Sequence, residues 1–141
     1  MKSNKVFTLI ELLAVIVILA IIALIATPII LGVIDTAKKG SAEASALAYV
    51  KAVEDQIVIG QVTAETTDDI TIPTTGTQDY ATTDLAGVQV KGTKPNAEGT
   101  TIVIDSTGAV VEGTCLSVTM SGSTYNVSYN GSKAEVVESC E

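Results

Sequence analysis

Residues 7–34 read FTLIELLAVIVILAIIALIATPIILGVI, and this stretch decides how the chain is organised. From Leu12 to Ile34 it contains no ionisable group. As a helix, this part would be about 35 Å long, enough to cross the ~30 Å hydrocarbon layer of a bilayer. Glu11 lies four residues inside the apolar run, where a carboxylate is costly and needs a physical reason.

The flanking sequence predicts a membrane anchor with a defined orientation. The apolar stretch is about twice as long as that of a secretory signal peptide. Lys2 and Lys5 precede the stretch, whereas the charges between residues 35 and 43 cancel. By the positive-inside rule, the short N-terminus lies in the cytoplasm and the C-terminal part lies outside.

The composition of the 141 residues excludes several functional classes. The net charge is −8, and the chain has no His and no Trp. We therefore expect no nucleic acid binding by the soluble part, which lacks a basic patch and stacking aromatics. No catalytic residues, no cofactor and no metal site are predicted, because the usual general base and commonest metal ligand are missing. An enzyme is the least expected class.

The two cysteines, Cys115 and Cys140, both lie in the predicted extracellular part. An extracellular location predicts that the two cysteines form one disulfide, and the alternative is a pair of reduced thiols. A bridge between them would contribute roughly 3–4 kcal/mol by the chain-entropy model, a large share of the stability of a small domain.

The segment Phe7-Thr8-Leu9-Ile10-Glu11-Leu12-Leu13, after a short lysine-containing leader, resembles the N-terminus of type IV pilins and pseudopilins. The similarity covers about residues 2–34, and the lysine-rich, arginine-free chain looks more like Gram-positive members. The resemblance implies that a prepilin peptidase cuts between Val6 and Phe7 and that the new Phe7 amine is methylated. It also implies that the apolar helix passes from the membrane into the core of a helical filament.

The resemblance gives Glu11 a partner, the Phe7 amine of a neighbouring subunit. A carboxylate buried in an apolar bundle is strongly unfavourable unless a cation meets it. Such a pair penalises every wrong axial register, because a misplaced subunit leaves a buried charge alone. The alternative is that Glu11 is a boundary residue tolerated at the membrane surface.

Val6 departs from the family's pattern, whereas a proline inside the apolar helix, here Pro28, is part of the resemblance. The family's processing site normally has Gly before the cut, and this chain has the β-branched Val6, so we predict slow or absent cleavage by a typical prepilin peptidase. Pro28 removes one helical hydrogen bond and predicts a kink near residues 24–28. That kink is either merely tolerated or, as the family suggests, a stretch that lets the filament extend.

Beyond the apolar stretch, residues 35–60 predict an amphipathic continuation of the helix. Apolar side chains recur at helical spacing, and Gly60 is the expected stop. The positions that share the predicted buried face are Ala46, Tyr49, Val50, Val53 and Ile57.

Residues 61–141 predict a small β domain that begins with a threonine-rich loop at residues 61–84. We expect a short strand at residues 70–72 and an additional one near residues 88–90. Further strands are expected at residues 101–104, 109–112, 116–120, 125–129 and 134–137, with Asn130-Gly131 as the strongest turn signal.

The expected fold class is α+β: a long N-terminal helix, apolar in its first half, whose amphipathic half packs on a small antiparallel sheet. The expected division is a leader at 1–6, a membrane and filament-core helix at 7–34, its continuation at 35–60, and a β domain at 61–141. The implied function is the structural subunit of a type IV pilus, a homo-oligomer that starts as a single-pass membrane precursor and ends as an extracellular filament.

The partners implied by the resemblance are further copies of the chain, the membrane, the prepilin peptidase and the pilus assembly machinery. One alternative is a pseudopilin of a type II secretion or competence DNA-uptake apparatus. Another is a membrane-anchored ligand-binding domain that does not polymerise. The sequence does not choose among adhesion, motility, DNA uptake and secretion.

Overall fold

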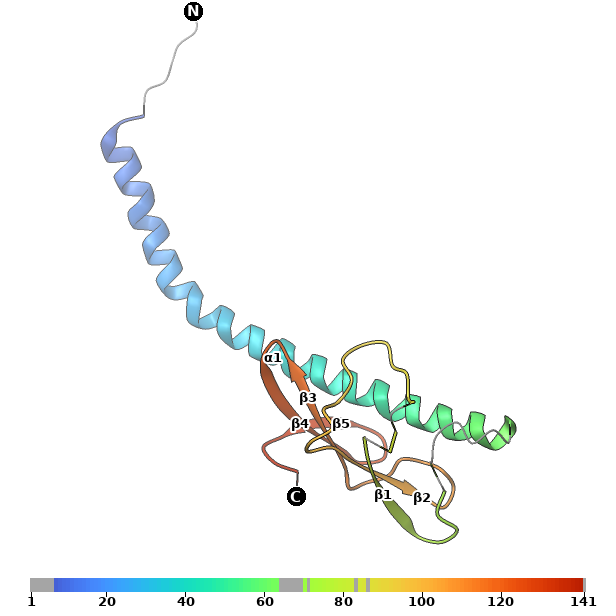
Figure 1. Cartoon of the computed structure of the whole chain (residues 1–141). Helices are drawn as coiled ribbons and strands as arrows, with labels where there is room; N and C mark the ends of the chain where they lie inside the picture. Colours follow the sequence, from blue (N-terminus) through green and yellow to red (C-terminus); the bar gives the residue numbers. More distant parts are fainter. Residues whose placement is uncertain (1–6, 64–69, 71, 83, 86, 141) are drawn as a thin grey trace, which may run out of the picture. The chain divides into compact units, whose positions relative to one another are not determined.

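A computed structural model describes residues 7–63, 70, 72–82, 84–85 and 87–140 (Figure 1). One long helix precedes five strands, which confirms the α+β class. The elements are α1 (Leu9–Thr63), β1 (Thr77–Ala81), β2 (Thr101–Asp105), β3 (Thr114–Met120), β4 (Ser123–Tyr129) and β5 (Ala134–Val137). The chain divides within α1 into two compact units, residues 1–37 and 38–141.

Helix α1 continues through Pro28 and also through Gly60. The expectation that Gly60 ends the helix was wrong. Gly60 is absent from the glycines with positive φ, so it keeps a right-handed backbone and the helix runs on to Thr63. Glycine ends a helix when the chain turns into the left-handed region, and here it does not.

The sheet is antiparallel throughout, with the strand order β1-β2-β3-β4-β5. The β3–β4 hairpin closes with Ser121 and Gly122, both at positive φ (49° and 83°), as in the turns that suit the twist of a two-residue hairpin. In the β4–β5 turn, Asn130 Oδ1 accepts hydrogen bonds from the N–H groups of Ser132 and Lys133. The turn expected at Asn130-Gly131 is therefore confirmed.

The core of the C-terminal unit lies between the second half of α1 and one face of the sheet. All five positions of the predicted buried helix face are 0–5% exposed. Opposite them lie buried residues of β2, β3 and β4, including Ile102, Leu116 and Val127. The helical periodicity of residues 46–57 therefore predicted correctly which face of the helix is buried.

Three expectations about strands were wrong. Residues 109–112 form only an isolated bridge between Ile104 and Val110, because Val103, whose carbonyl accepts the N–H of Val111, donates its own N–H to Thr114 Oγ1 at 2.9 Å instead of completing the pair. The N–H of Val110 points away from β2 and donates to Glu54 on α1 at 3.2 Å. Residues 88–90 form no strand, and neither do the described residues Ile70 and Ile72; residue 71 lies outside the described residues.

Strand β1 was not predicted, since it lies in the threonine-rich segment expected to be a loop. Its residues read TQDYA, and among them Tyr80 alone is buried. Such a polar strand carries little hydrophobic signal of its own. It forms by pairing all five residues with β2, an arrangement that local sequence does not encode.

Candidate assembly site

The start of α1 brings together Thr8 and Glu11, and both side chains are exposed. One carboxylate oxygen of Glu11, Oε2, accepts hydrogen bonds from the N–H of Thr8 at 2.8 Å and from its hydroxyl at 2.7 Å. In return, the Glu11 N–H donates to Thr8 Oγ1 at 3.3 Å. This reciprocal pattern is a capping box, which satisfies backbone donors that a helix start leaves without partners.

The capping box gives Glu11 a role inside its own chain that the sequence interpretation missed. The signal was present, because Thr8 and Glu11 stand three residues apart directly before an apolar run. The box directs the carboxylate toward the N-terminus of the helix. A charge held there is also favourably placed relative to the helix dipole.

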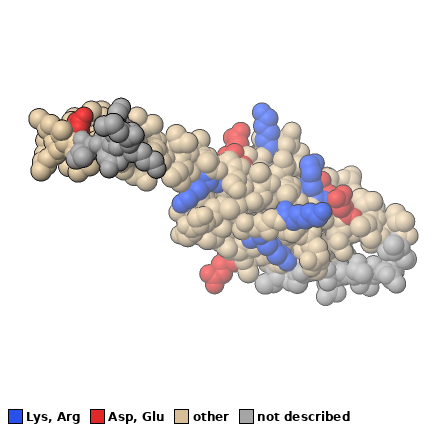
Figure 2. Space-filling view, turned by 90° about the horizontal axis from the view of Figure 1, so that it is seen from above, with Lys and Arg blue, Asp and Glu red and all other residues tan. Residues whose placement is uncertain are grey.

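The rest of this unit presents apolar surface on all sides. Every Phe, Leu, Ile and Val from Phe7 to Ile34 is at least 45% exposed. In Figure 2 the described atoms of this part are tan except for one red acidic side chain, whereas charged side chains are spread over the C-terminal unit. A helix that is apolar all round requires apolar surroundings, either lipid or copies of itself. Within the described residues, α1 is the one helix long and apolar enough to cross a membrane.

The hydroxyls inside the apolar unit are satisfied within the helix. Thr27 donates to the carbonyl of Ala23 at 2.7 Å, and Thr36 donates to that of Gly32 at 3.0 Å. Back-bonded hydroxyls are compatible with a membrane because they leave no polar atom without a partner. Pro28 lies inside the helix next to Thr27, and the kink expected there stays a prediction.

The other site residues are placed as follows. Phe7 is described and 79% exposed, whereas Val6, on the other side of the predicted cut, lies outside the described residues. Cys115 and Cys140 form a disulfide, as expected, with Cα atoms 5.9 Å apart. The bridge joins the beginning of β3 to the tail that follows β5.

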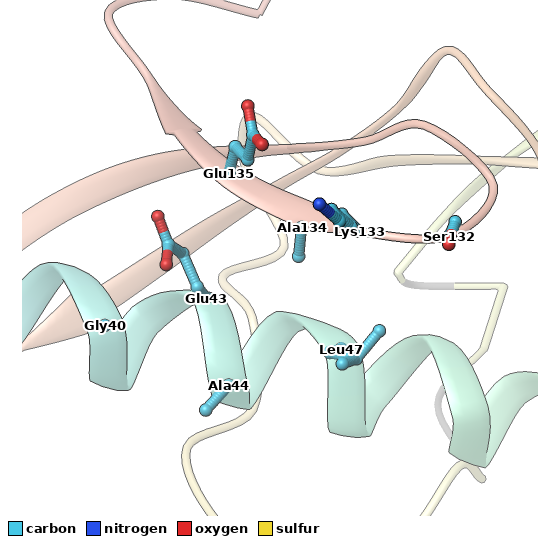
Figure 3. A pocket seen from close by; sticks show the side chains of 8 residues that line it. All are labelled: Gly40, Glu43, Ala44, Leu47, Ser132, Lys133, Ala134 and Glu135. Atoms are coloured by element: carbon cyan, nitrogen blue, oxygen red, sulfur yellow. The ribbon is translucent and has the colours of Figure 1, made fainter.

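The part of the chain that the structure describes holds no cluster of three or more His, Cys, Asp or Glu side chains that could bind a metal. A shallow slot of about 420 Å³ lies between α1 and the β4–β5 turn, lined by Gly40, Glu43, Ala44, Leu47 and residues 132–135 (Figure 3). It belongs to the C-terminal unit and contains none of the predicted assembly residues.

Comparison with known proteins gives one match. The family model described as the prokaryotic N-terminal methylation motif matches residues 1–27, the segment that contains the capping box and the first part of the apolar helix. Neither curated proteins nor solved structures gave a significant match. Proteins of this motif family are structural rather than enzymatic. The helix-on-sheet fold, the exposed apolar helix and this motif support a similarity to type IV pilins.

Proposed function

We propose that the protein is the structural subunit of a type IV pilus, assembled by burying residues 7–34 among copies of itself. The observation that carries this proposal is an exposed, fully apolar helix with one carboxylate held at its start by Thr8. The methylation motif over residues 1–27 supports it. In this function the protein begins as a single-pass membrane precursor and ends in an extracellular filament.

The carboxylate of Glu11 is the part of the surface that gives assembly its register. Lipid is as apolar as the helix, so transfer from the membrane into a helical bundle gains little from the hydrophobic effect and depends on packing and polar pairing. The capping box satisfies one oxygen of Glu11, but within residues 7–63 no cation lies beside its negative charge. A cation from a neighbouring copy supplies the missing charge, and copies set at another height do not.

We infer that this cation is the amine of Phe7, freed when the leader at residues 1–6 is removed. In the uncut chain the Phe7 nitrogen belongs to a peptide bond and carries no charge. The pairing therefore needs a peptidase that accepts Val6 before the cut. Methylation of the freed amine keeps its positive charge.

Replacing Glu11 tests the pairing directly. Glu11→Val removes the capping acceptor and the charge together, while Glu11→Gln keeps an acceptor oxygen for Thr8 and removes only the charge. We expect both variants to insert into the membrane as well as the wild type does, and both to form no filaments. Electron microscopy of surface material, with peptide identification, measures the outcome.

The two variants also separate the two roles of Glu11. Filaments formed by Glu11→Gln at the wild-type level would show that helix capping matters and charge pairing does not. Fibres on the cell surface favour a pilus, and short envelope-spanning assemblies favour the pseudopilin of a secretion or DNA-uptake apparatus. Membrane-bound chains that form neither favour an anchored ligand-binding domain.

A further inference from the structure

The two outer strands of the sheet, β5 and β1, each leave one edge without a neighbouring strand among the described residues. Outward-pointing N–H and C=O groups on such an edge are a template for pairing with another chain. Both edges belong to one sheet, so pairing β5 of one copy with β1 of the next would continue without closing. At each edge, a carboxylate oxygen accepts a hydrogen bond from a backbone N–H that points away from the sheet.

At the β5 edge the carboxylate comes from α1. The N–H of Asn130 donates to the carbonyl of Lys133, which makes these two a hydrogen-bonded pair of the β4–β5 ladder. Because such pairs alternate in an antiparallel ladder, the partners Val127 and Val136 form a pair without mutual hydrogen bonds. The N–H of Val136 therefore points away from β4, and Glu43 Oε1 accepts it at 3.1 Å.

At the β1 edge the carboxylate comes from the loop that follows the strand. Val103 of β2 donates its N–H toward β3, to Thr114 Oγ1, so its partner Asp79 points its own backbone groups away from β2. The backbone groups of Ala81, two residues further along β1, therefore also point away from β2. Asp84 Oδ2 accepts the N–H of Ala81 at 3.0 Å.

The slot beside β5 shows why a side chain is needed at that edge. Small residues, Gly40 and Ala44, line its helix side, so little bulk covers the strand there. Figure 3 shows the side chain of Glu43 rising from α1 toward β5, with Ala134 pointing back toward the helix. The N–H of Ala134 lies on the same outward side as that of Val136, because the two residues are two apart in the strand.

We propose that Glu43 and Asp84 are edge-capping residues, which prevent β5 of one copy from pairing with β1 of another. A carboxylate on the outward N–H occupies the donor that an incoming strand would use, and its charge must lose hydration if a strand displaces it. With both edges capped, the sheets of two copies do not pair. The inference concerns the sheet alone and does not depend on the filament.

Two single variants and their mixture test the proposal on the full chain in detergent. Glu43→Ala frees β5 while β1 stays capped, and Asp84→Ala frees β1 while β5 stays capped. We expect each variant alone to sediment like the wild type, and their mixture to form a one-to-one complex. The double variant carries both free edges and is expected to form larger, open-ended species that grow with concentration.

Amide hydrogen exchange reports whether each cap was removed. Exchange at Val136 should rise about tenfold in Glu43→Ala, and exchange at Ala81 by a similar factor in Asp84→Ala, as expected for the loss of one hydrogen bond. Glu43→Gln and Asp84→Asn keep an acceptor oxygen and serve as matched controls that should not form the complex. Glu135→Ala removes another carboxylate that lines the slot and should also change nothing.

A further substitution locates the partner edge. Asp79→Pro in the Asp84→Ala variant removes an outward N–H of β1 without removing a β1–β2 hydrogen bond, and it should abolish the complex with Glu43→Ala. The proposal is overturned if the mixture of Glu43→Ala and Asp84→Ala shows only the sedimentation of the two separate variants, although the amides of Val136 and Ala81 exchange faster. It is equally overturned if neither amide responds to loss of its carboxylate.

Discussion

Gly108 shows how one residue links the sheet to the helix. It has φ +85°, and a Cβ built there would lie 2.8 Å from Cγ2 of the buried Ile57 on α1. Gly122 has a similar φ of +83°, yet nothing lies within 4 Å of its Cβ position. Both positions require glycine for their backbone, and only Gly108 requires it for space.

We therefore predict that Gly108→Ala destabilises the C-terminal unit far more than Gly122→Ala. The backbone strain alone should cost about 1 kcal/mol in Gly122→Ala, and overpacking should add roughly 1–3 kcal/mol in Gly108→Ala. Near-ultraviolet circular dichroism in urea measures this unit by itself, because all four tyrosines lie within residues 38–141. Equal losses in the two variants would contradict the packing argument.

Tyr49 carries the buried hydroxyl that has no hydrogen-bond partner among the described residues. The side chain is 0% exposed, and burial raises the pKa of Tyr49 to about 12. We predict that Tyr49→Phe raises the free energy of unfolding by about 1 kcal/mol, since it removes a desolvated polar atom and keeps the ring. A lower urea midpoint in this variant would show that the hydroxyl has a partner after all.

Asp105 fixes the turn after β2. Its Oδ1 accepts hydrogen bonds from the hydroxyl of Thr107 at 2.6 Å and from the N–H groups of Thr107 and Ala109 at 2.8 and 3.0 Å. Bonds to the charged form, those from Thr107 first, hold the pKa of Asp105 below its ordinary value of 3.8. Its stabilising effect is therefore complete above that value and is lost as the pH falls through the lowered pKa.

The expected consequence concerns acid unfolding. Between about pH 5 and pH 2, the free energy of unfolding of the wild type should fall more than that of Asp105→Asn, which keeps an acceptor oxygen but does not titrate. Urea midpoints at a series of pH values measure this difference. Parallel pH profiles of the two proteins would contradict the assignment.

At the scale of elements, α1 serves two environments as one continuous helix. Its first part is exposed, apolar on all sides and has its hydroxyls bonded within the helix. Its second part buries one face on the sheet and carries two carboxylates, Glu43 and Glu54, that accept backbone N–H groups of the β domain. The helix therefore holds the sheet by polar contacts at two places as well as by its apolar face.

The last strands depend on a covalent element too. The bridge between Cys115 and Cys140 ties the tail after β5 back to the central strand β3. We predict that reduction lowers the free energy of unfolding of the C-terminal unit by about 3 kcal/mol, with the earliest loss of amide protection in β5. Cys140→Ser should show the same loss without reductant and no further change with it. An unchanged urea midpoint in reductant would contradict a stabilising role.

At the scale of the whole molecule, the two units are suited to different surroundings. Residues 7–34 are apolar enough to need lipid or copies of themselves, and the acidic C-terminal unit suits water. In the proposed function, assembly uses the first unit and leaves the sheet edges of the second capped. If both proposals hold, three carboxylates, Glu11, Glu43 and Asp84, decide whether copies of the chain associate through their helices or through their strands.

The sequence by itself determined the features that depend on composition and local periodicity. The apolar helix, the buried face at residues 46–57, the β4–β5 turn at Asn130-Gly131 and the last strand were all readable from short windows. The Thr8–Glu11 capping box was also readable, since its two members stand three residues apart, although it was not predicted. Local patterns predict these features because the interactions behind them are themselves local.

Tertiary structure alone decided the features that depend on contacts between distant residues. Strand β1 exists because β2 pairs with it. Residues 109–112 stop at a single bridge because Val103 donates its N–H to Thr114 Oγ1 rather than to Val111. The caps on Val136 and Ala81 depend on the strand order, which decides which edges are left open. A backbone N–H carries no sequence signal for the partner it will find, so only the folded chain could reveal these contacts.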